Sequence, residues 1–155
     1  LHIFGAIVAF GPTFAFPLIG GMGGNEPMHA NFARRITGKI EGGITIPLAV
    51  VQGITGLGLL LISGRNLADR ANYWLGVAIV LYAIALGFAI FVQTKRIEHV
   101  VALTSSPPPP PAPGAAPAGP PPVVLAAVKA VRQGGTLLTV LVVTIIFLMV
   151  MKPTF

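Results

Sequence analysis

The three histidines have the widest chemical range among the side chains of this sequence, because imidazole can bind a metal or exchange a proton. His2 stands at the start of an apolar run, whereas His29 and His99 lie in polar stretches. A neutral imidazole on an apolar helix is a common axial ligand of haem iron. His2 is therefore a candidate haem ligand. The alternative is that it lies at the interface end of its helix or hydrogen-bonds to a neighbouring helix.

The other residues that could do chemistry do not form a known catalytic set. His29 and His99 could approach each other as a metal site, although solvated surface histidines are the simpler interpretation. The sequence has no cysteine, which excludes disulfides and thiolate ligands. It contains no Ser, His and Asp arrangement, phosphate-binding glycine loop or two-histidine helix motif. These observations favour a protein without catalytic residues.

The composition requires a lipid environment. Hydrophobic residues make up 54% of the 155 residues and charged residues only 9%, whereas a soluble domain carries about 25% charged residues. A bilayer core about 30 Å thick is crossed by about 20 helical residues, so the chain has room for four spans in a single membrane domain, 1–155. The net charge of +6 comes from Lys and Arg scattered at the span ends, which suits lipid headgroups and argues against nucleic acid.

Four apolar runs predict an all-α fold, a polytopic bundle of four transmembrane helices. The spans are expected at about 1–21, 43–62, 73–92 and 136–151. Pro12 and Pro17 predict a kink in the first span. Tyr73 and Trp74 open the third span with the aromatic pair expected at headgroup depth.

The second span combines small and polar residues. Glycines permit close approach of another helix, and polar side chains among them can hydrogen-bond across the interface. The residues are Thr45, Gln52, Gly53, Thr55, Gly56 and Gly58. Because such bonds are worth only about 0.6 kcal/mol on average, we expect packing here and no chemistry.

Carboxylates are scarce, and each is expected in a loop or at the end of a span. They are Glu26, Glu41, Asp69 and Glu98. Ion pathways in membranes commonly use buried Asp or Glu. The sequence therefore argues against a proton-coupled transporter built on such residues.

A stretch rich in Pro and Ala, 105–122, separates the third span from the fourth and predicts a semi-rigid polyproline II linker. The interpretations are a tolerated loop insertion or a docking segment for a proline-recognising partner. Residues 123–133 are expected to form a helical lead-in to the last span.

The distribution of basic residues predicts an orientation in the cell membrane. The first and third connections hold three and four Lys or Arg, whereas the second connection holds two and the C-terminus one. By the positive-inside rule the first and third loops, with the linker, face the cytoplasm and both termini face outward.

Four segments carry a resemblance to a known group of membrane proteins. They read LHIFGAIVAFGPTFAFPLIG at 1–20, ITIPLAVVQGITGLGLLL at 44–61, YWLGVAIVLYAIALG at 73–87 and VMKPTF at 150–155. In their order, and in the terminal Lys-Pro, the chain resembles the CopD-like superfamily of small integral membrane proteins. It is most similar to the uncharacterised domain-of-unknown-function family 2269 and more distantly to HemJ-type protoporphyrinogen oxidase.

The HemJ-type resemblance implies haem binding through His2, since those enzymes carry a His near the start of the first span. They also carry a Lys in the third span, within a segment that reads approximately Trp-Leu-His-Val-Lys. Here that segment is Trp74, Leu75, Gly76, Val77 and Ala78. The missing Lys argues against porphyrinogen oxidation.

We therefore expect a non-catalytic integral membrane protein, an accessory or structural subunit of a larger membrane assembly such as an electron-transfer complex. Its expected partners are the lipid bilayer and other membrane-protein subunits. The alternative is a haem-binding membrane redox protein with His2 as axial ligand. A copper-handling or transport component is a third hypothesis, against which stand four Met, no Cys and three His.

Overall fold

The computed structural model describes residues 1–25, 29–105 and 119–153, and every regular element in these ranges is helical. Four helical segments are long and apolar enough to cross a bilayer: His2–Gly23, Ala30–Ser63, Arg70–Leu103 and Pro122–Met151. The prediction of an all-α bundle with four transmembrane helices is confirmed. Most of the predicted linker, from 106 to 118, lies outside the described residues.

The first segment changes helix type in its middle. α1 (His2–Phe10) leads into the 3₁₀ turn η1 (Gly11–Ala15), which leads into α2 (Phe16–Asn25). Pro12 lies at the start of η1. Because proline has no N–H to donate to the preceding turn, it disturbs an α-helix at this point. The 3₁₀ turn thus begins at Pro12, one of the two prolines from which the sequence predicts a kink; the kink itself stays a prediction.

The second and third segments each contain a π-helical turn. α3 (Ala30–Ile40) continues through η3 (Glu41–Thr45) into α4 (Ile46–Ser63). After the short 3₁₀ turn η4 (Arg70–Asn72), α5 (Tyr73–Phe88) continues through η5 (Ala89–Gln93) into α6 (Thr94–Leu103). At about 1.5 Å per residue, each 34-residue segment is about 50 Å long. Both helices therefore extend well beyond the expected spans 43–62 and 73–92.

The last segment is one unbroken helix, α7 (Pro122–Met151). The predicted helical lead-in at 123–133 is confirmed, because it is continuous with the last span. The helix ends at Lys152, which takes the left-handed conformation with φ 46°. Its N–H donates to the carbonyl of Leu148 at 3.0 Å, closing the last turn.

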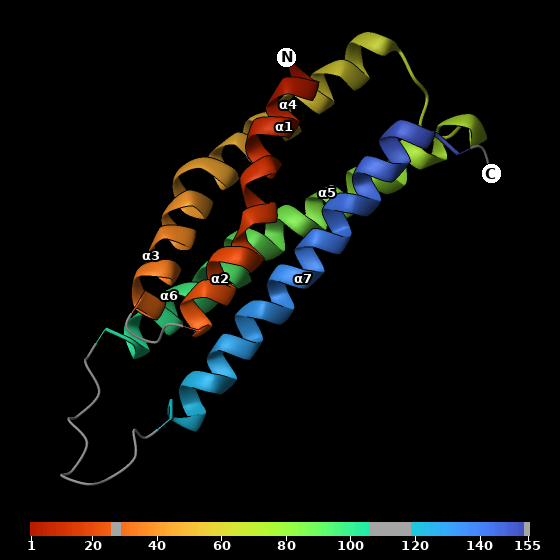
Figure 1. The fold of residues 1–155 in the computed structure, drawn as a ribbon. Coiled ribbons are helices and arrows are strands. Elements are labelled where there is room, and N and C mark those ends of the chain that lie inside the picture. Colours follow the sequence, from red (N-terminus) through yellow and green to blue (C-terminus); the bar gives the residue numbers. More distant parts are fainter. Residues whose placement is uncertain (26–28, 106–118, 154–155) are drawn as a thin grey trace, which may run out of the picture.

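The helices pack in chain order. α1 packs against α4 and α2 against α3, α3 packs against α6, and α5 and α6 both pack against α7. Consecutive segments run in opposite directions, so both chain ends lie at the same end of the bundle (Figure 1). Among the described residues, no extended contact joins α7 to α1 or α2. The bundle is therefore an open array and not a closed ring of helices.

Little of the molecule is shielded from its surroundings. The best-shielded positions are small residues such as Ala9 and Ala78, and a cluster of Trp74, Ala78 and Leu148 joins α5 to α7. No large side chain among the described residues is fully buried. Because the outward faces are apolar, they suit contact with lipid or with other membrane helices.

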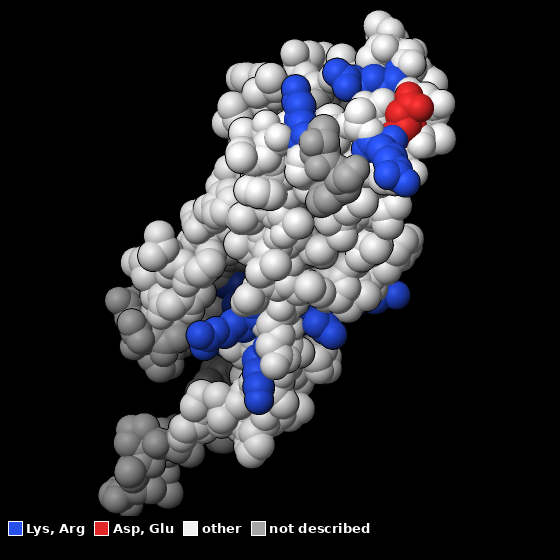
Figure 2. Space-filling view, turned by 90° about the vertical axis from the view of Figure 1, so that its right-hand side faces the viewer, with Lys and Arg blue, Asp and Glu red and all other residues white. Residues whose placement is uncertain are grey.

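Basic residues mark two levels on the molecule. Figure 2 shows Lys and Arg in two groups separated by an uncharged zone, on a face turned 90° from that of Figure 1. Along the last segment, Arg132 lies within α7 and Lys152 directly follows the helix. About 20 residues separate them, and at 1.5 Å per residue they span about 30 Å, the thickness of a hydrocarbon core. The bundle thus carries an apolar belt of the height that a bilayer requires.

Candidate functional site

The candidate ligand His2 lies between two helices and uses both of its ring nitrogens. Nδ1 lies 3.0 Å from Oγ1 of Thr55, and Nε2 lies 3.1 Å from Nε2 of Gln52. His2 belongs to α1, whereas both partners belong to α4. The bonds therefore tie the first transmembrane segment to the second. This confirms the prediction that polar groups of the second span hydrogen-bond to another helix.

The hydrogen bonds fix where the imidazole proton lies. The amide nitrogen of Gln52 can only donate, so Nε2 of His2 accepts. Nδ1 then carries the proton and donates to Oγ1 of Thr55. That hydroxyl in turn donates to the carbonyl of Gln52 at 3.0 Å. The ring proton of His2, one amide proton of Gln52 and the hydroxyl proton of Thr55 thus each have an acceptor in this part-buried network, which stabilises the packing of the two helices.

Glycines allow α1 and α4 to approach each other at this network. A Cβ on Gly5 would lie 2.7 Å from Oε1 of Gln52, and a Cβ on Gly56 would lie 3.0 Å from Cε1 of His2. Oε1 of Gln52 is itself buried and has no hydrogen-bond partner among the described residues. Gly56 of the second span therefore makes room for the imidazole, and Gly5 of the first span makes room for the amide.

Haem binding at His2 would compete with this network. Iron would need the lone pair of Nε2 that accepts the hydrogen bond from Gln52, so the amide would have to turn away first. His29 and His99 cannot supply the second axial ligand to the same iron, because α2 and α3 meet at the opposite end of the bundle and α6 ends there (Figure 1). Haem binding stays a prediction.

A second polar network joins α6 and η5 to α7. Nε2 of Gln93 donates to the carbonyl of Val131 at 3.0 Å, and Nη1 of Arg96 donates to the carbonyl of Ala130 at 3.2 Å. Gln93 is only 3% exposed, and its Oε1 has no hydrogen-bond partner in the described part of the chain. The guanidinium of Arg96 also lies 5.6 Å from the centre of the Phe88 ring, a cation–π contact.

Other polar side chains also hydrogen-bond to the backbone of a neighbouring segment. The hydroxyl of Tyr82 on α5 donates to the carbonyl of Ala49 on α4. Nδ2 of Asn31 on α3 donates to the carbonyl of Thr104 at 3.1 Å, beyond the end of α6.

His29 and His99 are both exposed. In residues 1–25, 29–105 and 119–153 no group of three metal-binding side chains occurs. The polar groups described here therefore connect helices and do not converge on a reaction centre.

The comparison with known families gives one match. A family model described as "Predicted integral membrane protein (DUF2269)" matches residues 1–153. The chain belongs to the DUF2269 family. It matches no curated protein and no solved structure. The recognition of this family from the sequence is confirmed, and DUF2269 membership agrees with the four membrane-spanning helices. The wider resemblance to CopD-like and HemJ-type proteins stays a prediction.

The sequence of this DUF2269 chain did not predict the burial of one residue. Glu41 was expected in a loop or at the end of a span; it lies within a continuous helix, two residues before the predicted start of the second span, and is only 6% exposed. It is the first residue of the π-helical turn η3. The two glycines that follow it, Gly42 and Gly43, were the available sequence signal for an irregular turn at this point. The π-helical turn inserts a residue into the helix and rotates the preceding turn. This change of register is not readable from hydropathy.

Proposed function

We propose that this membrane protein is a non-catalytic subunit that packs against other membrane proteins in a larger assembly. The observation that carries the proposal is the open arrangement of its helices. The first and last segments do not pack along each other in the described part of the chain, and both present apolar outward faces. Such faces suit the helices of a partner, since membrane helices associate by close packing.

The polar networks support the non-catalytic part of the proposal. His2, Gln52 and Thr55 bond to one another across α1 and α4, and Gln93 and Arg96 bond to the backbone of α7. Side chains that could do chemistry are thus used to hold neighbouring helices together. The basic end of the bundle is proposed to face the cytoplasm, following the excess of Lys and Arg there.

Site-specific photo-crosslinking in native membranes tests this proposal. A photoreactive amino acid is placed at Val140 on α7 or at Ile54 on α4, both of which point outward. We expect a defined protein adduct from at least one of these positions, together with a complex larger than the chain under mild detergent. The matched control is Ala78, which is fully buried and should react only within the chain. Lipid adducts alone, with a protein that migrates as a monomer, would contradict the proposal.

A further inference from the structure

The pocket between α3 and α6 joins a buried acid to a basic rim. It has a volume of about 440 Å³, within the range of about 300–1,000 Å³ for small-molecule sites. Its floor is formed by small and apolar side chains of the two helices. The lining residues include Arg34, Arg35, Gly38, Glu41, Ile97 and Glu98. None of these residues belongs to the His2 or Gln93 networks described above.

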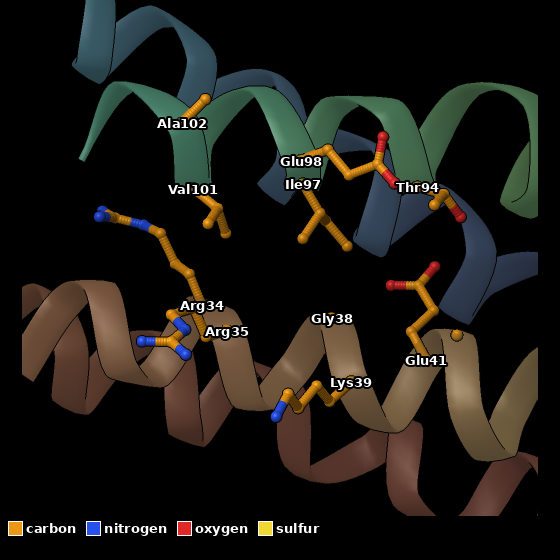
Figure 3. Close-up of a pocket in the computed structure, with 11 residues that line it drawn as sticks. Arg34, Arg35, Gly38, Lys39, Glu41, Thr94, Ile97, Glu98, Val101 and Ala102 are labelled. Carbon is orange, nitrogen blue, oxygen red and sulfur yellow. The ribbon is translucent and has the colours of Figure 1, made fainter. Parts of the chain in front are cut away.

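Glu41 is the unusual member of this lining. The residue is only 6% exposed, but its carboxylate oxygens are not among the buried polar atoms without a partner in the described residues, so they keep their accessible surface where Glu41 lines the pocket. Figure 3 shows the carboxylate pointing from its own helix across the gap toward Thr94 and Glu98. A largely buried carboxylate is stabilised by a hydrogen-bond donor or a cation at the oxygens that it keeps accessible. The geometry therefore leaves a place for a hydrogen-bond donor or a cation in the pocket.

The opposite end of the pocket has the opposite charge. Arg34 and Arg35 lie there below Val101 (Figure 3), on the turn of α3 about 10 Å from Glu41. Guanidinium groups bind phosphate through two parallel hydrogen bonds. Figure 3 shows both guanidinium groups directed away from Glu41, with Lys39 between the two ends. The long flexible side chains of the two arginines would have to turn toward the acid to hold a phosphate of the same ligand. A ligand that satisfies both ends carries a phosphate and an ammonium group.

The depth of the pocket along the bundle indicates whether such a ligand would be a lipid headgroup or a soluble molecule. Gln93 and Arg96 bond to the carbonyls of Val131 and Ala130, so they lie level with the beginning of the 30 Å apolar stretch of α7. Thr94, in the same turn, lines the pocket beside Glu41. The pocket thus begins at the boundary of the hydrocarbon core and extends into the headgroup layer.

We propose that this pocket binds a phosphoethanolamine group, supplied as the headgroup of an aminophospholipid. The primary ammonium lies at Glu41 and Glu98, and the phosphate is held by Arg34 and Arg35. A choline headgroup has no N–H to donate to the carboxylates, and a glycerol headgroup has no cation. The site therefore discriminates among lipids by the chemistry of the headgroup and not by net charge. This inference does not depend on the assembly proposed above.

Native mass spectrometry of the full chain with matched-acyl lipids tests the proposal. We expect phosphatidylethanolamine to bind more tightly than phosphatidylcholine or phosphatidylglycerol. In Glu41→Gln that preference should fall about tenfold, because a charge-assisted hydrogen bond is lost. Asp69→Asn is the matched control, since it changes the net charge equally at the opposite end of the bundle and should leave the preference unchanged.

Several results would overturn the proposal. Equal binding of the ethanolamine and choline lipids by the wild-type chain excludes a site built for a primary ammonium, whether or not any variant folds. Tighter binding of phosphatidylglycerol indicates a site for anions alone. An unchanged preference in Glu41→Gln, with circular dichroism matching the wild type, removes Glu41 from the site. If free phosphoethanolamine displaced the lipid at equal concentration, the ligand of the pocket would be a soluble molecule and not a lipid.

Discussion

Gln93 lies so close to the backbone of Gly134 that a Cβ at position 134 would overlap Oε1 of its amide. The same hypothetical Cβ would lie 3.0 Å from Cδ of Gln93 and 3.2 Å from Nη1 of Arg96. Only glycine therefore permits the hydrogen bond from Gln93 to the carbonyl of Val131. This contact fixes how α7 packs against the third membrane-spanning segment, at η5.

Gly134→Ala is expected to weaken the docking of α7. The added methyl group forces the buried amide of Gln93 to move and to give up its bond to Val131. Overpacking of this kind costs about 1–3 kcal/mol. The measurement is the midpoint of denaturation by sodium dodecyl sulfate in mixed micelles, where the variant should unfold at a lower detergent fraction than the wild type.

Gly135→Ala is the matched control, because a Cβ there meets nothing within 4 Å. It should leave the midpoint unchanged or raise it slightly, since alanine is the better helix former by about 1 kcal/mol. In Gln93→Ala the clash is absent, so adding Gly134→Ala to that background should cost less than it does alone. Equal losses at positions 134 and 135 would rule out the Gln93 contact as the cause.

Gly56→Ala is expected to loosen the first helix. A Cβ at this position lies 3.0 Å from Cε1 of His2, so the imidazole must shift away from Thr55 and Gln52. We expect a loss of about 1 kcal/mol, the scale of two interhelical hydrogen bonds. Gly58→Ala serves as the control, because the space around Gly58 is open. If both substitutions lowered the midpoint equally, the close approach of α1 and α4 at Gly56 would be refuted.

His2→Ala separates the packing role of His2 from the haem hypothesis. If His2 only joins helices, the variant loses about 1 kcal/mol of stability and the absorption spectrum of the purified protein does not change. A Soret band in the wild type that disappears in His2→Ala would instead establish haem binding. His2→Gln, which keeps a donor and an acceptor, should recover part of the stability without restoring such a band.

The orientation can be tested with single cysteines, because the chain has no native cysteine. Ser63→Cys and Ser105→Cys place near-isosteric thiols at opposite ends of the bundle, and both positions are exposed. In intact cells a membrane-impermeant maleimide should label position 63 and not position 105. In permeabilised cells it should label both. The reverse pattern would place the basic end outside.

The sequence by itself determined the class of this protein and the number of its membrane-spanning segments. Lipid offers backbone groups no hydrogen-bond partners, so apolar runs of sufficient length must be helical. Family membership was also readable, from the order of four segments. The role of the second span in binding another helix followed from its glycines and from Gln52 and Thr55.

The tertiary structure alone decided which polar groups meet. His2 finds Gln52 and Thr55, and Gln93 finds Gly134, because of the register between helices that are far apart in the chain. Glu41 is buried at the first residue of a π-helical turn, an irregularity that hydropathy does not show. Hydropathy specifies that a segment crosses the membrane, whereas helix rotation and register, set by packing, specify what each polar side chain contacts.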